Sequence, residues 1–170
     1  RWLIFIAYMV GLSIGVHLLN LLVIPAIVFI YYFKKYETTK WGIIKSAALS
    51  IVILGVIMWG IIPGVIIVAG WFELLFVNGF GMPFNTGVVI YALLLIAGLT
   101  FGIRYTLKHN HTVVNTILTC FVVMLIGYSC YAMVVIRSVS NPPIDENSPD
   151  NVFSLLSYIS RDQYGQEPLV

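Results

Sequence analysis

Long apolar runs separated by short polar segments dominate the chain from residue 2 to residue 136. This pattern predicts an all-α integral membrane protein with about five transmembrane helices and one interfacial or re-entrant helix. The expected spans cover about 2–16, 18–34, 43–62, 87–103 and 112–136, and the interfacial segment covers 65–79.

The first apolar run, from residue 2 to residue 33, is too long for one span. As a single helix it would measure about 48 Å, whereas the hydrocarbon core of a bilayer is about 30 Å thick. Gly15, His17 and Asn20 indicate a break between two short spans, and Pro25 is expected to kink the second of them. The third span is expected to end near Pro63.

Lysine and arginine set the expected orientation. Four lysines mark loop 34–45, and Arg104 with Lys108 marks loop 104–111. The positive-inside rule places both loops in the cytoplasm, which requires two crossings between them. Segment 65–79 should then lie in the outer interface or re-enter the membrane there. The alternative, a further crossing at 65–79, would put Arg104 and Lys108 outside.

This orientation puts three polar features on the outer face: the turn at His17, segment 65–86 and the tail after residue 136. Residues 137–170 are expected to be a non-cytoplasmic tail that leads into a truncated outer domain. Residues 141–147 contain two prolines and cannot be helical.

A short amphipathic helix is expected after this proline segment. Ser148 or Asp150 should cap it, and Tyr164-Gly165 should end it. Its apolar face consists of Val152, Leu155, Leu156 and Ile159, at helical spacing and suited to docking.

Composition supports the membrane assignment, because 60% of the residues are hydrophobic and only 9% are charged. A soluble domain normally carries about 25% charged residues. The net charge of +2, with no basic stripe, argues against a nucleic-acid partner. Cys120 and Cys130 lie about 15 Å apart on one helical run, too far to bridge each other. The chain opens at Arg1 rather than Met, which suggests a piece of a longer protein.

Five polar residues at or near membrane depth are candidates for substrate binding, because such groups usually face a cavity or a partner. They are His17, Asn20, Glu73, Asn78 and Asn85.

Each candidate also has a structural interpretation. His17 could satisfy carbonyl groups at the helix break while Asn20 caps the next helix. Glu73 could act as a base, bind a metal or pair with a substrate, or it could simply face water on an amphipathic helix. Asn78 and Asn85 flank glycines, so they could be turn residues or could bind a polar headgroup or sugar hydroxyls.

Two further polar clusters have structural interpretations that we favour. His109 and His111 are expected in a solvated loop. Asp145, Glu146 and Asp150 could hold a divalent cation, but an ordinary acidic loop explains them as well. The chain contains none of the common nucleotide-binding, metalloprotease or hydrolase motifs. The residues therefore predict a membrane bundle with a polar outer face, without a reaction, a cofactor or a metal.

Three stretches nevertheless resemble a known family. They are residues 11–22 (GLSIGVHLLNLL), residues 73–87 ending in Phe84-Asn85-Thr86-Gly87, and the tail 141–165. Together they resemble a bacterial multi-pass family similar to protein O-mannosyltransferases, glycosyltransferase family 117 of the GT-C superfamily. The resemblance extends over nearly the whole chain and places it in the C-terminal part of the membrane region.

The resemblance implies an enzyme of the inner membrane that moves a sugar from a polyprenyl-phosphate donor to an acceptor, such as a protein hydroxyl, at the periplasmic face. Its base would be a carboxylate in a first outer loop, which would precede Arg1, so no catalytic residue is assigned here. The five candidates would line the donor or acceptor site. The alternatives are a non-catalytic membrane subunit or scaffold whose tail docks a partner, and a small transporter.

Overall fold

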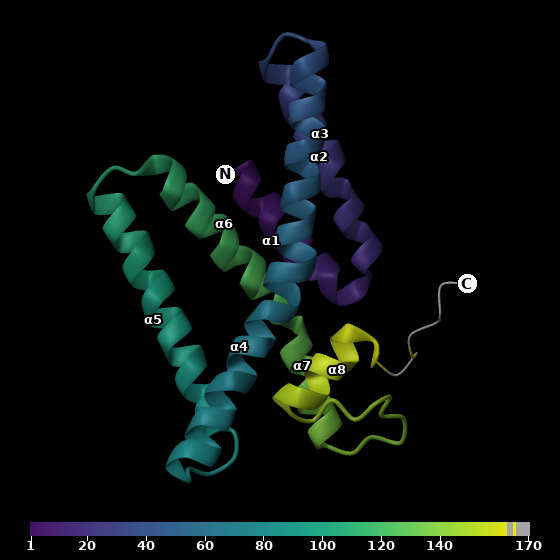
Figure 1. Cartoon of the computed structure of the whole chain (residues 1–170), viewed down its shortest axis with the longest axis vertical. Helices are drawn as coiled ribbons and strands as arrows, with labels where there is room; N and C mark the ends of the chain where they lie inside the picture. Colours follow the sequence, from purple (N-terminus) through teal and green to yellow (C-terminus); the bar gives the residue numbers. More distant parts are fainter. Residues whose placement is uncertain (163–164, 166–170) are drawn as a thin grey trace.

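The computed structural model describes residues 1–162 and residue 165. Throughout this part of the chain the regular elements are helices, which confirms the expected all-α fold (Figure 1). Within these described residues, four helical segments are long and apolar enough to cross a membrane, and the first helix is apolar but shorter. The four are Leu18–Lys35, Lys40–Gly79, Thr86–Lys108 and Thr112–Val139.

The break expected near His17 is present. Helix α1 (Trp2–Val16) ends there, and a 3-10 turn, η1 (Leu18–Leu22), leads into α2 (Val23–Lys35). Pro25 lies in the first turn of α2, where its missing N–H removes no α-helical hydrogen bond. The sequence predicts a kink within the span at Pro25. The structure instead has the 3-10 turn η1 before α2, and Pro25 stands near the start of that helix.

The third helix does not end near Pro63, contrary to expectation. The chain is helical from Lys40 to Gly79, as α3 (Lys40–Gly55), η2 (Val56–Ile61), α4 (Ile62–Leu74) and η3 (Leu75–Gly79). Pro63 is tolerated because it stands at the start of α4, directly after the π-helical turn η2. These 40 residues measure about 60 Å, so the helix either runs obliquely through a membrane or extends beyond its core.

The second half of the chain contains α5 (Thr86–Lys108), α6 (Thr112–Tyr128) and α7 (Cys130–Val139). Helix α5 extends past the expected end at residue 103, which leaves residues 109–111 as the turn. This turn is fastened by Asn115, whose amide donates to the carbonyl of Ile103 at 3.1 Å.

Helix α1 packs against α6 through glycines. A methyl group added at Gly127 would collide with backbone atoms of Tyr8, Gly11 and Leu12, and one added at Gly11 would collide with the backbone of Met124. Small residues allow membrane helices to approach this closely. The crossing forms part of a core that also includes Ile14, Leu21, Ile66 and Tyr128.

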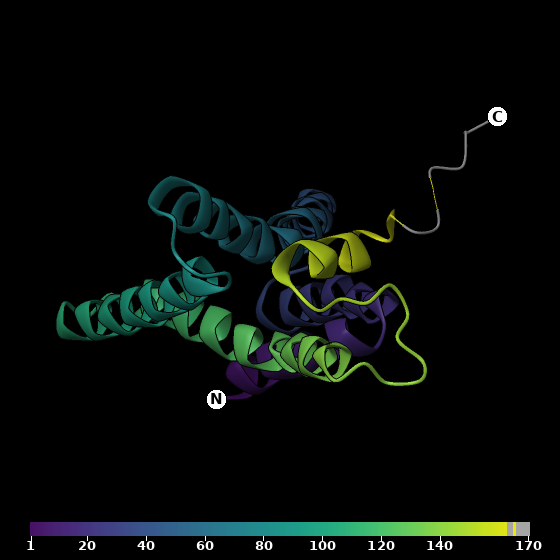
Figure 2. The same cartoon turned by 90° about the horizontal axis from the view of Figure 1, so that it is seen from below.

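Helix α8 (Val152–Ser160) follows the proline-containing loop. Its cap is Asn151, which forms a reciprocal capping box with Ser154, rather than Ser148 or Asp150. The helix ends at Ser160, before the expected Tyr164-Gly165; Tyr164 is outside the described residues. Its expected apolar face packs against the core of the same chain, with contacts between α8 and α4 (Figure 2).

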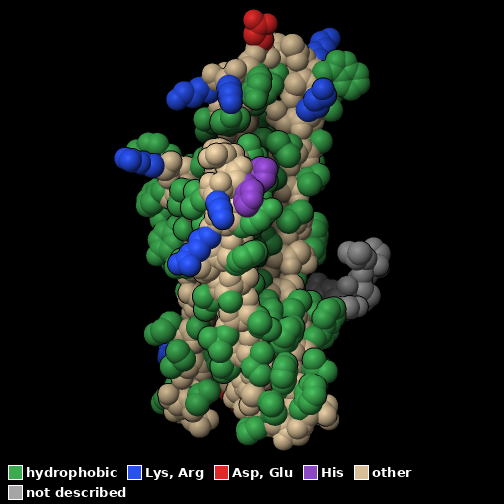
Figure 3. Space-filling view, turned by 90° about the vertical axis from the view of Figure 1, so that its left-hand side faces the viewer, with side chains coloured by type: hydrophobic (Ala, Val, Ile, Leu, Met, Phe, Trp, Pro, Cys, Tyr) green, Lys and Arg blue, Asp and Glu red, His purple; other side chains and the backbone are tan. Residues whose placement is uncertain are grey.

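The two turns that carry lysine or arginine lie apart from the other turns of the bundle. In Figure 1 the α2–α3 and α5–α6 turns point toward the top and upper left, whereas the turn after α1, the α4–α5 turn and α8 lie lower or to the right. Most of the Lys and Arg side chains visible in Figure 3 lie in the upper half of the molecule. The turns expected in the cytoplasm thus lie away from α8 and the α4–α5 turn.

Candidate functional site

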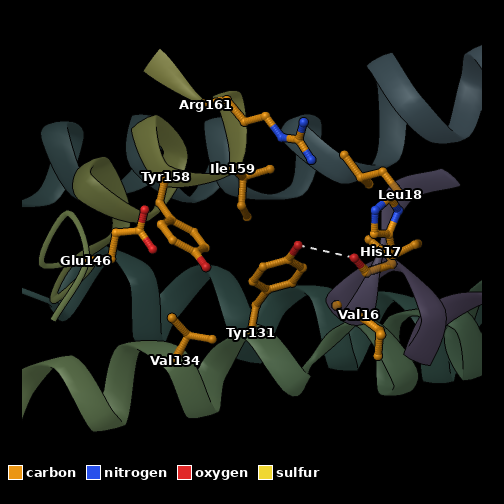
Figure 4. Close-up of a pocket in the computed structure, with 11 residues that line it drawn as sticks. Val16, His17, Leu18, Tyr131, Val134, Glu146, Tyr158, Ile159 and Arg161 are labelled. Atoms are coloured by element: carbon orange, nitrogen blue, oxygen red, sulfur yellow. Dashed lines mark hydrogen bonds between the residues drawn. The ribbon is translucent and has the colours of Figure 1, made fainter. Parts of the chain in front are cut away.

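A polar pocket of about 310 Å³ lies between the end of α1, α7 and α8 (Figure 4). It joins segments that are far apart in sequence, because the tail folds back over the break after α1. Its polar side chains are those of His17, Tyr131, Glu146, Tyr158 and Arg161.

His17 enters the pocket because α1 stops there. Its backbone is extended, with φ −161° and ψ 121°, and its Nδ1 accepts the N–H of Leu19 at 3.2 Å. His17 therefore caps η1, a role that the structural interpretation gave to Asn20, and its ring accepts an N–H instead of satisfying carbonyl groups. With Nδ1 as acceptor, the neutral ring carries its proton on Nε2, which leaves a donor for a ligand.

Tyr131 closes the end of α1 from the other side. Its hydroxyl donates to the carbonyl of Ile14 at 3.2 Å, as Figure 4 shows. This carbonyl belongs to the last turn of α1, where the helix itself provides no donor. Tyr131 thus satisfies a carbonyl group at the break, which was one of the two roles considered for His17, and it joins α7 to the end of α1.

Two charged side chains reach the pocket from the tail. Arg161 ends α8 in a left-handed conformation, with φ 60°, and its guanidinium extends over the pocket toward the side of His17 (Figure 4). Glu146 lies on the opposite side, beside Tyr158. A cation, an imidazole and phenol hydroxyls around one pocket can bind a phosphate and sugar hydroxyls.

An apolar groove of about 540 Å³ lies on the other side of α7. Its walls come from α4, α5, the α6–α7 region and the start of α8, and small side chains such as Ala69, Ala92 and Ala132 line it. Asn85, Asp150 and Asn151 line it as well. Tyr131 lines both the groove and the polar pocket, so the two cavities share a wall.

Glu73 does not face water, which was one of the roles that its sequence context left open. Only 1% of its surface is exposed. One carboxylate oxygen accepts the N–H of Asn85, and the other accepts the N–H of Val88 at 3.1 Å. Glu73 thus caps the positive end of α5 from the neighbouring helix, since the side chain of Asn85 makes no capping bond there.

The five candidate residues are not all brought together. Glu73 and Asn85 form one unit at the α4–α5 turn, and His17 lies in the polar pocket. Asn20 lines a third cavity, between α1 and the start of α2, and Asn78 is exposed in the π-helical turn η3. Sequence reasoning missed Tyr131, Tyr158 and Arg161 as site residues, although it placed the tail on the same face as His17.

The acidic loop and the histidine pair are arranged by local contacts. Asp145 accepts the hydroxyl of Ser138 at 2.8 Å, and Asp150 accepts that of Ser154 at 3.0 Å. His109 and His111 stack with ring planes 11° apart. Within the residues that the structure describes, no three His, Cys, Asp or Glu side chains gather as a metal site would require.

Comparison with known families gives a match over the first part of the chain. Residues 1–40 match the model described as Protein O-mannosyl-transferase TMEM260 N-terminal domain. The matched part contains the stretch 11–22, and with it His17 of the polar pocket. Comparisons with curated proteins and with solved structures give no match. The similarity over residues 1–40 supports a relationship to protein O-mannosyltransferases.

Proposed function

We propose that this chain is part of a membrane glycosyltransferase of the GT-C type that moves a sugar from a polyprenyl-phosphate donor to a protein hydroxyl. The observation that carries this proposal is the shared wall at Tyr131, which sets a polar pocket beside an apolar groove. A lipid-linked sugar needs both environments, since its prenyl chain is apolar and its phosphate and sugar are polar. The match of residues 1–40 supports the same reaction class.

In this proposal the groove holds part of the prenyl chain, and the pocket holds the phosphate and sugar. Arg161 pairs with the phosphate, while His17 and Tyr158 donate to phosphate or sugar oxygens. Asn85 contacts the donor at the groove, and Glu73 acts indirectly by holding Asn85 in place. Asn20 and Asn78 remain candidates for acceptor contacts. The catalytic base is not assigned to this chain.

We further propose that the enzyme belongs to a bacterial inner membrane. The loops at 34–45 and 104–111 would lie in the cytoplasm, and the tail would lie in the periplasm with the pocket. The separation of the basic turns from α8 and the α4–α5 turn supports this orientation. The alternative of a scaffold with a docking tail gains no support from α8, because its apolar face packs within the chain.

Arg161→Gln tests the proposal in the complete protein in its membrane. We expect transfer from radiolabelled polyprenyl-phosphomannose to protein to fall about tenfold to a hundredfold, mainly through a raised KM for the donor, because a charge-assisted bond to phosphate is lost. Arg137→Gln removes the same charge from α7 at a residue that does not line the pocket, and it should leave transfer unchanged. Equal losses in both variants, or wild-type membranes without transfer, would contradict the proposal.

A further inference from the structure

The α2–α3 turn concentrates positive charge at a place that the transfer proposal does not use. Four of the nine Lys and Arg residues of the chain lie within residues 34–45, and Glu37 is the one acid in that segment. Lys34 and Lys35 end α2, while Lys40 and Lys45 lie in the first turns of α3. All four side chains are exposed.

The backbone of this turn is held rigidly by Tyr32. Its buried hydroxyl donates to the carbonyl of Glu37 and accepts the N–H of Thr39, each at 3.0 Å. Gly42 makes room for this hydroxyl, because a methyl group at that position would collide with it. The lysines are therefore attached to a fixed backbone, which reduces the entropy lost when they bind a common target.

Exposed aromatic rings surround the lysines. Tyr31, Phe33, Tyr36 and Trp41 each expose half or more of their surface. The ammonium group of Lys35 lies over two of these rings, 5.3 Å from the centroid of Tyr31 and 5.9 Å from that of Tyr36. Aromatic rings beside lysines at the ends of apolar helices are typical of the level of lipid headgroups.

We infer that the α2–α3 turn is a binding surface for the headgroups of anionic phospholipids. The four lysines supply the attraction to phosphate, and the aromatic rings hold the turn at headgroup depth. The two helices that carry the turn belong to segments long and apolar enough to span a membrane, so lipid headgroups are the anions within reach. Binding of a soluble polyanion would leave the exposed aromatic rings in water, whereas lipid headgroups and acyl chains would cover them.

Quenching of Trp41 by brominated lipids tests this inference directly. The full chain with Trp2, Trp59 and Trp71 replaced by Phe retains Trp41, which is 73% exposed, as its sole indole. In bilayers that mix phosphatidylglycerol with phosphatidylcholine, either lipid can carry the bromine. We expect phosphatidylglycerol to be preferred at Trp41 by about threefold to tenfold, and added salt to weaken this preference.

A matched indole controls for lipid contact in general. A second protein retains only Trp71, which lies in α4 and is 66% exposed. It should show no preference between the two lipids, since Lys and Arg do not flank Trp71 in sequence. A preference of equal size at Trp41 and Trp71, or none at Trp41, would overturn the inference.

Charge variants show whether the lipid preference depends on the α2–α3 turn itself or only on the net charge of the protein. Lys34→Gln with Lys40→Gln should remove most of the preference at Trp41, whereas Lys34→Arg with Lys40→Arg should retain it. Arg104→Gln with Lys108→Gln removes the same charge from the α5–α6 turn and should have little effect. Tyr32→Phe keeps every charge but loses the bonds to Glu37 and Thr39, and it should reduce the preference. An equal effect of both double Gln variants, or none from Tyr32→Phe, would contradict a preorganised surface.

Discussion

Replacing Gly127 by leucine is expected to separate α1 from α6 and to lower the free energy of unfolding by at least about 3 kcal/mol. The position faces backbone atoms of Tyr8, Gly11 and Leu12, which cannot move aside as the end of a flexible side chain could. The helices must therefore move apart, and the small-residue packing that holds them together is lost. Because α1 and α7 both line the polar pocket, the binding of the proposed donor should be lost as well.

Thermal unfolding of the protein in detergent measures this effect. Gly98→Leu is the matched control, since Gly98 is also a glycine within a long helix but has open space around its added side chain. We expect a large fall in the unfolding temperature for Gly127→Leu and almost none for Gly98→Leu. If both variants unfolded at the wild-type temperature, the close crossing of α1 and α6 would be wrong.

Replacing Glu73 by alanine should destabilise the α4–α5 turn by about 2–4 kcal/mol. The carboxylate is buried and accepts the N–H groups of both Asn85 and Val88. Alanine leaves these two donors unpaired at the positive end of α5, where no other side chain of the turn caps them. The two helices are in close contact here, because a methyl group added at Gly87 would collide with the backbone of Phe72 and Glu73.

Amide hydrogen exchange at residues 85–88 reports on this contact, together with thermal unfolding. We expect faster exchange in Glu73→Ala, and an intermediate effect in Glu73→Gln, which keeps one acceptor oxygen. Glu37→Ala removes an exposed acid from the α2–α3 turn and should leave exchange at 85–88 unchanged. Unaltered exchange in Glu73→Ala would show that the carboxylate does not cap α5.

The parts of the fold that follow from local chemistry could be predicted. Gly15 and His17 mark a break that the structure contains, and the apolar face of α8 packs as its spacing indicates. The basic segments correspond to turns at the ends of long helices, because charged side chains are excluded from lipid. These features depend on residues that are neighbours in sequence.

Features that depend on tertiary contacts could not be predicted. A proline usually ends or kinks a helix, but Pro63 follows a π-helical turn within a continuous helical segment. Tyr128 also donates a hydrogen bond to the adjacent carbonyl of Ile62 at 2.8 Å. The burial of Glu73 could not be predicted, because its partners, Asn85 and Val88, belong to the start of the next helix. Arg161 joins His17 only because the tail folds back across the bundle.

The most direct test of the central claim is photo-crosslinking with a polyprenyl-phosphomannose that carries a photoreactive group in its prenyl chain. If the groove beside Tyr131 holds the donor, crosslinks should map to residues 88–95 and 128–139 and should disappear with excess unlabelled donor. Ala132→Trp should block them by filling the groove, whereas Ala48→Trp, at an exposed position of α3, should not. Crosslinks spread over the lipid-facing helices, insensitive to competitor and to Ala132→Trp, would contradict the account.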